Sequence, residues 1–159
     1  MLRWKFAVAT ALAVTAVAGP AAVAADAQTA TALATCSGTG CDDKDPNDTG
    51  CSAGASTVPG SGFRPYNGYL EMRFGNCATN WARFTVSENG HYAIWVQRQA
   101  SSGIPAREGR HYEFDGTTTG GPYWSDQLYA PNVPLTKARV CVTRRAYPWW
   151  DNAQCSGWF

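Results

Sequence analysis

The two histidines, His91 and His111, are the side chains of this 159-residue chain that ionise near neutral pH and could exchange protons in a reaction. Glu88 and Glu113 stand near them in the sequence and could complete an acid–base pair. Neither a strand-to-helix nucleophile elbow nor a metal-binding H-E-x-x-H helix is predicted, because the chain carries almost no helical pattern. We therefore assign no catalytic residue, and we keep a small hydrolase using His91 or His111 as an alternative interpretation.

Carboxylates are concentrated in one short segment that runs from Asp42 to Asp48. Their hard oxygen atoms suit Ca²⁺. The EF-hand pattern fails, however, because counting from Asp43 puts Asp48 at the position of the turn glycine and Gly54 at that of the bidentate glutamate. The interpretation we favour is a loop whose Asp and Asn side chains bind their own backbone. No metal or other cofactor is predicted.

Aromatic side chains in predicted loops are the best candidates for ligand contact. One pair follows Gly120-Gly121-Pro122, and a second group flanks Pro148. Large rigid rings supply contact area at a low entropy cost, which suits a flat surface for sugar rings or for a protein partner. The alternative is that these rings seal the ends of the fold. The candidate ligand-binding residues are Tyr123, Trp124, Tyr147, Trp149 and Trp150.

Six cysteines indicate a disulfide framework, since an even number of thiols can be fully paired in an oxidising compartment. A zinc site is disfavoured because no C-x-x-C pair is present and both histidines are far from the cysteines in the sequence. Sequence cannot fix the connectivity, but proximity along the chain favours one bridge between the last two cysteines. The other four would then share two bridges. The disulfide residues are Cys36, Cys41, Cys51, Cys77, Cys141 and Cys155.

The first residues have the pattern of a secretory signal. Arg3 and Lys5 precede an apolar run over residues 6–18, and small residues then supply a cleavage site of the A-x-A kind, which predicts a signal peptide over residues 1–24. An uncleaved membrane anchor would need roughly 20 apolar residues, more than this run contains. A lipid anchor on Cys36 would leave an odd number of cysteines for pairing. We expect a secreted, extracellular protein without membrane contact after cleavage.

The mature chain has the size and charge of one ordinary domain. A small, polar stretch over residues 25–35 predicts a flexible lead, and residues 36–159 predict a single disulfide-stabilised domain. Cleavage removes two basic residues, which leaves 11 basic and 12 acidic residues and a net charge of −1. Nucleic acid is not an expected partner of such a chain. We expect a monomer.

Period-two alternation of apolar and polar residues predicts strands. Residues 69–74 alternate in this way, and residues 81–98 predict a β-hairpin around the Asn89-Gly90 turn signal. Further strands are predicted over residues 111–114, 123–129 and 137–143. The fold class is therefore all-β, a small antiparallel β-sandwich or barrel with a loop-rich, disulfide-tied N-terminal segment.

Several motifs resemble the YjfA-like family of secreted bacterial proteins. Leu70 to Arg83 is similar to the family's L-E-x-R-(aromatic)-x-x-C-x-x-x-W-A-R signature. Cys41 to Pro46 looks like its C-x-x-K-D-P element, Thr49-Gly50-Cys51 like T-G-C, and the last five residues like its C-x-x-W-aromatic end. This resemblance implies export and a disulfide fold. It assigns no catalytic or ligand residue, because the function of the family's domain is unknown. Some relatives carry this domain on the outer side of a membrane span, which implies a role in sensing or binding.

The leading hypothesis is a secreted, non-catalytic module that binds a cell-wall or other extracellular ligand through the loop aromatics. A small secreted hydrolase is the first alternative. A secreted inhibitor or toxin that acts on another protein is the second.

Overall fold

The computed structural model describes residues 33–101, 103–131, 136–146 and 149–159, without the side chains of residues 146, 149 and 150. The predicted signal peptide and most of the predicted lead lie outside these residues. The described chain forms antiparallel β-strands and two short 3₁₀ helices, η1 (Gly38–Cys41) and η2 (Pro65–Asn67). The predicted all-β fold is confirmed.

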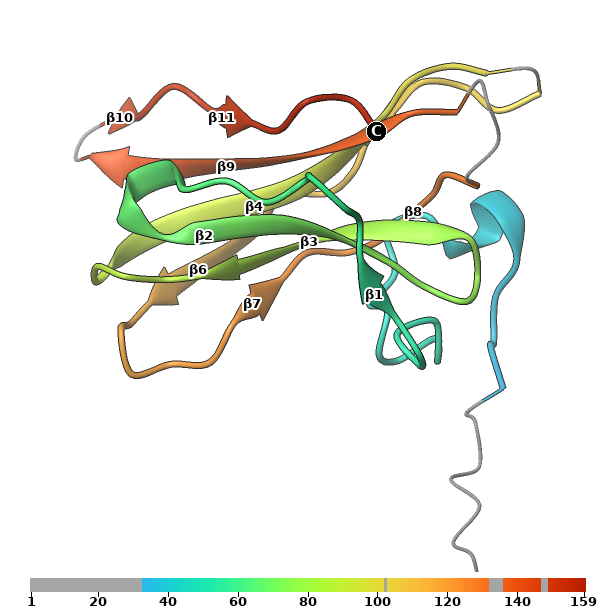
Figure 1. Ribbon diagram of the computed structural model, residues 1–159, viewed down its shortest axis with the longest axis horizontal. Coiled ribbons are helices and arrows are strands. Elements are labelled where there is room, and N and C mark those ends of the chain that lie inside the picture. The colour runs from blue at the N-terminus through green and yellow to red at the C-terminus, as the bar shows by residue number, and fades with distance from the viewer. Residues whose placement is uncertain (1–32, 102, 132–135, 147–148) are drawn as a thin grey trace, which may run out of the picture. The chain divides into compact units, whose positions relative to one another are not determined.

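Two sheets lie face to face as a β-sandwich (Figure 1). The five-stranded sheet has the order β1-β2-β3-β7, with β8 also paired to β3. Its strands are β1 (Ser56–Thr57), β2 (Tyr69–Phe74), β3 (Thr79–Thr85), β7 (Tyr123–Trp124) and β8 (Leu128–Tyr129). The six-stranded sheet has the order β10-β9-β4-β5, with β6 on β4 and β11 on β9. Its strands are β4 (Gly90–Arg98), β5 (Arg107–Glu108), β6 (Tyr112–Gly116), β9 (Ala138–Ala146), β10 (Trp149–Trp150) and β11 (Gln154–Cys155).

The core lies between the sheets and follows the alternation along the strands. Its buried residues from the five-stranded sheet are Leu70, Met72, Ala82, Phe84 and Leu128. Those from the six-stranded sheet are Tyr92, Ile94, Val96, Phe114, Ala138, Val140 and Val142. Phe84 and Tyr92 meet edge to face across the core, with ring centroids 5.3 Å apart.

The predicted hairpin over residues 81–98 is wrong. Strand β3 pairs with β2 and strand β4 pairs with β9, so the turn before Gly90 crosses from one sheet to the other. Alternation predicts which side chains point inward, and it is the same for a hairpin and for such a crossing. The long antiparallel ladder from Tyr92↔Arg144 to Arg98↔Ala138 gives β4 its partner instead.

Two tryptophans are buried outside the sandwich core. Trp81 and Trp95 are each 4% exposed, yet they alternate with core residues and so occupy the outer faces of the two sheets. Trp81 lies under the disulfide-tied N-terminal segment, where the backbone at Gly75 approaches both its ring and the carbonyl oxygen of Cys51. Trp95 stacks on His111 with ring centroids 4.1 Å apart. Loops therefore extend the apolar interior beyond the space between the sheets.

Three disulfides join the described cysteines, as the even cysteine count predicts. Cys141–Cys155 ties β9 to β11 and confirms the favoured bridge. The remaining four cysteines form Cys36–Cys41, within the N-terminal segment, and Cys51–Cys77, which ties that segment to the turn between β2 and β3. Such bridges are typical of proteins that fold in an oxidising compartment.

Candidate functional site

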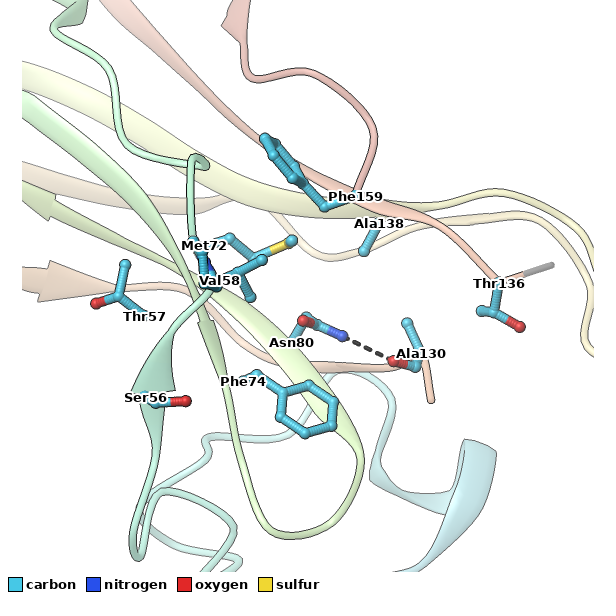
Figure 2. A pocket seen from close by; sticks show the side chains of 11 residues that line it. Ser56, Thr57, Val58, Met72, Phe74, Asn80, Ala130, Thr136, Ala138 and Phe159 are labelled. Carbon is cyan, nitrogen blue, oxygen red and sulfur yellow. Dashed lines mark hydrogen bonds between the residues drawn. The ribbon is translucent and has the colours of Figure 1, made fainter. Parts of the chain in front are cut away.

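A pocket of ≈ 220 Å³ opens between the two sheets, near the start of β9 and the C-terminal residue (Figure 2). Its apolar walls come from five separate parts of the chain. The apolar lining residues are Val58, Pro59, Met72, Phe74, Ala130, Ala138 and Phe159. Polar side chains lie among them at Ser56, Thr57, Asn80 and Thr136.

One wall of the pocket is the segment after β1, which is clipped onto β2 by backbone and side-chain hydrogen bonds. The backbone N–H of Val58 donates to the carbonyl oxygen of Met72 at 2.8 Å. The Ser61 hydroxyl donates to the carbonyl of Val58 at 2.7 Å and accepts from the N–H of Met72 at 3.0 Å. These bonds fix Val58 beside Met72 and so hold the two side chains on the same wall.

Another part of the wall depends on the last residue of the chain. Phe159 and Ala138 exchange both backbone hydrogen bonds at 3.0 Å, which extends β9 pairing to the C-terminal residue. The ring of Phe159 then borders the pocket while remaining 39% exposed. A large apolar ring that is partly exposed beside an apolar pocket is more typical of a ligand-binding site than of a close-packed core.

Asn80 supplies the pocket's one buried amide. Its Nδ2 donates to the carbonyl oxygen of Ala130 at 2.9 Å, and the residue is only 4% exposed. Among the described residues no group donates to its side-chain oxygen, and that atom is not enclosed. Since Asn80 lines the pocket, the free oxygen is an acceptor for a donor group on a ligand.

The chemistry of this lining suits binding and not reaction. The lining residues in the described chain are apolar, hydroxyl or amide side chains, and none of them titrates near neutral pH. An apolar cavity of about 150 Å³ is enough to take up benzene, whereas drug-sized ligands fill roughly 300–1,000 Å³. The pocket therefore fits one ring, one side chain or one short alkyl group of a ligand.

The predicted aromatic residues are carried by different sheets. Tyr123 faces inward from β7 and stacks on Phe114 with centroids 4.1 Å apart. Trp124 points to the outer face opposite Arg83 and is 39% exposed. Trp149 and Trp150 form β10 on the six-stranded sheet, but their side chains, like the whole of Tyr147, lie outside the described residues. Tyr123 thus seals the open edge of the sandwich, and Trp124 is left as an exposed ring.

Strand pairing places both histidines on the outer face of the six-stranded sheet, beside carboxylates that sequence spacing could not reveal. β4 and β6 place His91 opposite Asp115, and the His91 Nδ1 lies 2.8 Å from the Asp115 carboxylate. The His91 Nε2 lies 3.5 Å from Glu113 of β6, and His111 directly precedes that strand. The His111 Nε2 lies 2.7 Å from Glu108. Both rings are therefore engaged by carboxylates on the exposed face of the six-stranded sheet.

A second pocket, of ≈ 340 Å³, lies on this face and includes Trp95, His111, Glu113 and Thr143. The Thr143 hydroxyl, the alcohol in this lining, donates to the carbonyl oxygen of Asp151 at 2.6 Å. A serine-type nucleophile needs its hydroxyl hydrogen-bonded to a base instead. The arrangement around the histidines lacks that contact in the described part of the chain.

One literal G-x-S-x-G string occurs, from Gly50 to Gly54, and sequence reasoning passed over it. In the structure it lies in consecutive turns that lead to β1, so Ser52 does not occupy the strand-to-helix elbow of a hydrolase. The backbone N–H of Ser52 donates to the carbonyl of Pro46 at 2.9 Å, and the neighbouring Cys51 is in a disulfide. The string is part of the N-terminal segment's packing.

The carboxylates of the acidic segment accept hydrogen bonds from arginine side chains and from backbone N–H groups. The carboxylate of Asp42 accepts from Arg98 at 3.0 Å and from the N–H of Tyr129 at 2.7 Å. Asp45 accepts from the backbone N–H of Asn47 at 2.7 Å, which is the Asx-turn that the sequence predicts. These contacts engage both carboxylate oxygens of Asp42 and one oxygen of Asp45.

Burial and neighbouring arginine charges shift the pKa values of two further aspartates, Asp43 of the acidic segment and Asp126. Burial by itself would raise the pKa of Asp43, but hydrogen bonds from Arg107 and from the backbone N–H of Arg110, with their charges, lower that pKa below 3.8. Burial raises the pKa of Asp126 above 3.8, and Arg110 offsets this only in part.

Comparison with models of protein families, with curated proteins and with solved structures yields no match. The resemblance to the YjfA-like family therefore stays a prediction from the motifs. In the part of the chain that the structure describes, no helix combines the length and the apolar character that a membrane span requires.

Proposed function

We propose that this chain is a secreted, non-catalytic binding module whose end pocket takes up an apolar group of an extracellular ligand. The pocket bounded by Met72, Phe74, Ala138 and Phe159 is the observation that carries the proposal. It is concave, mostly apolar and furnished with one free amide acceptor, which is the common composition of a small-molecule site. The signal-like N-terminus and the three disulfides support a place of action outside the cytoplasm.

The ligand class follows from size and polarity. A space of ≈ 220 Å³ admits one phenyl-sized ring or a short alkyl chain, and the oxygen of Asn80 favours a group that bears an N–H or O–H donor. An aromatic or aliphatic side chain of a peptide meets both conditions, because the peptide backbone beside it supplies an N–H donor. The pocket would hold the apolar end, and the rest of the ligand would lie outside.

Benzyl alcohol is a suitable probe, because it combines a ring with a hydroxyl donor. We expect it to shift the NMR signals of Met72 and Ala138 at millimolar concentration. Ala138→Leu extends a side chain into the pocket and should weaken binding at least about tenfold, since the new atoms occupy the ligand's space. Toluene, which lacks the hydroxyl, should bind the wild type more weakly than benzyl alcohol does.

The matched control is Ala106→Leu, which makes the same change at an exposed position away from the pocket. It should bind the probe as the wild type does. Equal affinity in Ala138→Leu and in the wild type, with both proteins folded by circular dichroism, would rule out the pocket. Loss of binding in Trp149→Ala and Trp150→Ala alone would assign the ligand to the predicted loop aromatics instead.

A further inference from the structure

Four sulfur atoms gather where the N-terminal segment meets the turn between β2 and β3. The Sγ atoms of Cys36, Cys41, Cys51 and Cys77 all lie within 4.8 Å of one another, although they belong to two separate disulfides. Cys36 Sγ lies 3.6 Å from Cys51 Sγ in the other bridge. That separation is close to the 3–3.5 Å, approximately, at which positioned groups react. We call these four residues the sulfur cluster.

Access to the sulfur cluster is uneven. Cys41 and Cys51 are fully buried, whereas Cys36 and Cys77 are partly exposed. A reagent in solution can therefore reach one sulfur of each bridge, and the two accessible sulfurs lie on different segments. Thiol–disulfide exchange depends on which sulfur can be attacked. This pattern lets a thiol in solution attack Cys36 of the first bridge and leaves Cys77 of the second bridge accessible as a product thiol.

Gln127 favours Cys36 as the reactive sulfur. This residue is fully buried, and its Nε2 lies within donating distance of Cys36 Sγ, at 3.8 Å. The amide is held in place because Nε2 also donates to the hydroxyl of Thr49 at 2.9 Å, while Oε1 accepts from Thr79 at 2.8 Å. A donor aimed at a sulfur stabilises the thiolate, which is the nucleophilic form.

We propose that the sulfur cluster is a thiol–disulfide exchange site, in which a low-molecular-weight thiol reduces Cys36–Cys41 and Cys36 then attacks Cys51, so that a Cys36–Cys51 bridge forms and thiols are left at Cys41 and Cys77. The inference rests on the mutual distances of the four sulfurs and is independent of the ligand pocket. It adds a reactive site to a protein whose disulfides would otherwise be structural alone.

The exchange proceeds in three balanced steps. A reductant thiolate attacks Cys36 Sγ, the bond to Cys41 breaks, and Cys41 leaves as a thiolate that takes a proton from water. A second reductant thiolate attacks the reductant's sulfur in the mixed disulfide, so that the reductant departs as its own disulfide and Cys36 is left as a thiolate. This thiolate attacks Cys51 Sγ, and Cys77 leaves and is protonated. Two thiols of the reductant are oxidised, and thiols appear at Cys41 and Cys77.

The product differs from the starting state in what it ties together. The new Cys36–Cys51 bridge lies within the N-terminal segment, so no disulfide joins that segment to the β2–β3 turn any longer. The hydrogen bond from the N–H of Asn76 to the carbonyl of Cys51, 3.2 Å long, still spans the junction. The thiol of Cys77 is partly exposed and can attack a disulfide of another molecule, which forms a mixed disulfide with Cys77 and releases one thiol of that molecule.

The test uses the full oxidised protein and a single equivalent of dithiothreitol. After an acid quench, free thiols are labelled with a maleimide and the peptides are mapped by mass spectrometry. We expect labels on Cys41 and Cys77 together with a linked Cys36–Cys51 peptide. Labels confined to Cys36 and Cys41, with Cys51–Cys77 intact, would overturn the proposal. The Cys141–Cys155 bridge of the same molecule, which lies outside the sulfur cluster, should stay unlabelled.

A rate comparison provides the second measurement. The variant Cys36→Ser/Cys41→Ser removes the first bridge and leaves the second. With about 0.1 mM reductant, labelling of Cys77 should be at least about tenfold slower than in the wild type, because a neighbouring thiol acts at an effective concentration in the millimolar range or above. Equal rates in two proteins with the same far-UV circular dichroism spectrum would contradict the relay.

Discussion

At the residue scale, the N-terminal segment is held by a charge buried under it. The Arg98 side chain is 1% exposed, and its guanidinium donates to Asp42, whose side chain is 7% exposed. The same guanidinium also donates to the carbonyl oxygens of Tyr129 at 2.7 Å and Pro105 at 3.0 Å. The sequence predicts an acidic loop around Asp42 whose side chains bind their own backbone, but the partner of Asp42 lies 56 residues away and no local pattern could reveal it.

Removal of Asp42 should therefore be costly. Asp42→Ala leaves the Arg98 guanidinium buried without its counter-charge, and we expect the free energy of unfolding to fall by about 3–5 kcal/mol. Urea denaturation measures this change. The comparison variant is Arg107→Ala, because Arg107 is 45% exposed in its pair with Asp43 and should contribute less than about 1 kcal/mol. Similar losses in both variants would mean that burial does not decide the strength of these pairs.

Asp126 gives the protein a pH dependence of the opposite sign to that of most carboxylates. Its pKa is raised in the folded state by burial, so the folded chain binds a proton more tightly than the unfolded chain does. Stability is then lost as the pH rises from 3.8, the ordinary value, through the raised pKa. Asp126→Asn should unfold at a higher urea concentration than the wild type near neutral pH, and the difference should vanish toward about pH 3. A difference that is constant with pH would contradict this.

At the element scale, the turn between β2 and β3 both joins these two paired strands and contacts the N-terminal segment. Residues 69–74 were predicted as a strand and form β2 unchanged. Their partner is β3, through the turn that contains Cys77, while the stronger Asn-Gly signal before β4 proved to be a crossing between sheets. The β2–β3 turn also lies against the N-terminal segment, because Gly75 packs on Cys51 and Trp81.

Gly75→Ala tests that contact. An added methyl group would run into the carbonyl oxygen of Cys51 and the ring of Trp81, so the N-terminal segment must shift. We expect a loss of about 1–3 kcal/mol in the free energy of unfolding, measured by urea denaturation, together with faster proteolysis of residues 36–51. Gly121→Ala is the control, since nothing lies within 4 Å of a methyl group there. Equal stability of the two variants would show that the segment tolerates the displacement.

At the scale of the whole molecule, the ligand pocket arises only because distant segments meet. Its walls come from β1 and the segment after it, strand β2, the start of β3, the residue after β8, the start of β9 and the C-terminal residue. Each segment alone shows ordinary alternation, and no spacing of residues marks a pocket. The sequence-based candidates were large aromatics in loops, whereas the pocket is lined mainly by medium-sized apolar residues that the same alternation assigns to the core.

The sequence by itself determined the fold class, the inward-facing residues and the presence of three disulfides. Alternation depends only on neighbouring residues, and an even cysteine count depends only on composition, so neither requires knowledge of which segments pair. The tertiary structure decided which strands pair, since a hairpin and a crossing between sheets obey the same period-two pattern. It also decided that Arg98 neutralises Asp42, that His91 faces Asp115, and that four sulfurs share one small volume. These contacts join residues far apart in the sequence, and their geometry is fixed only when both sheets pack around one core.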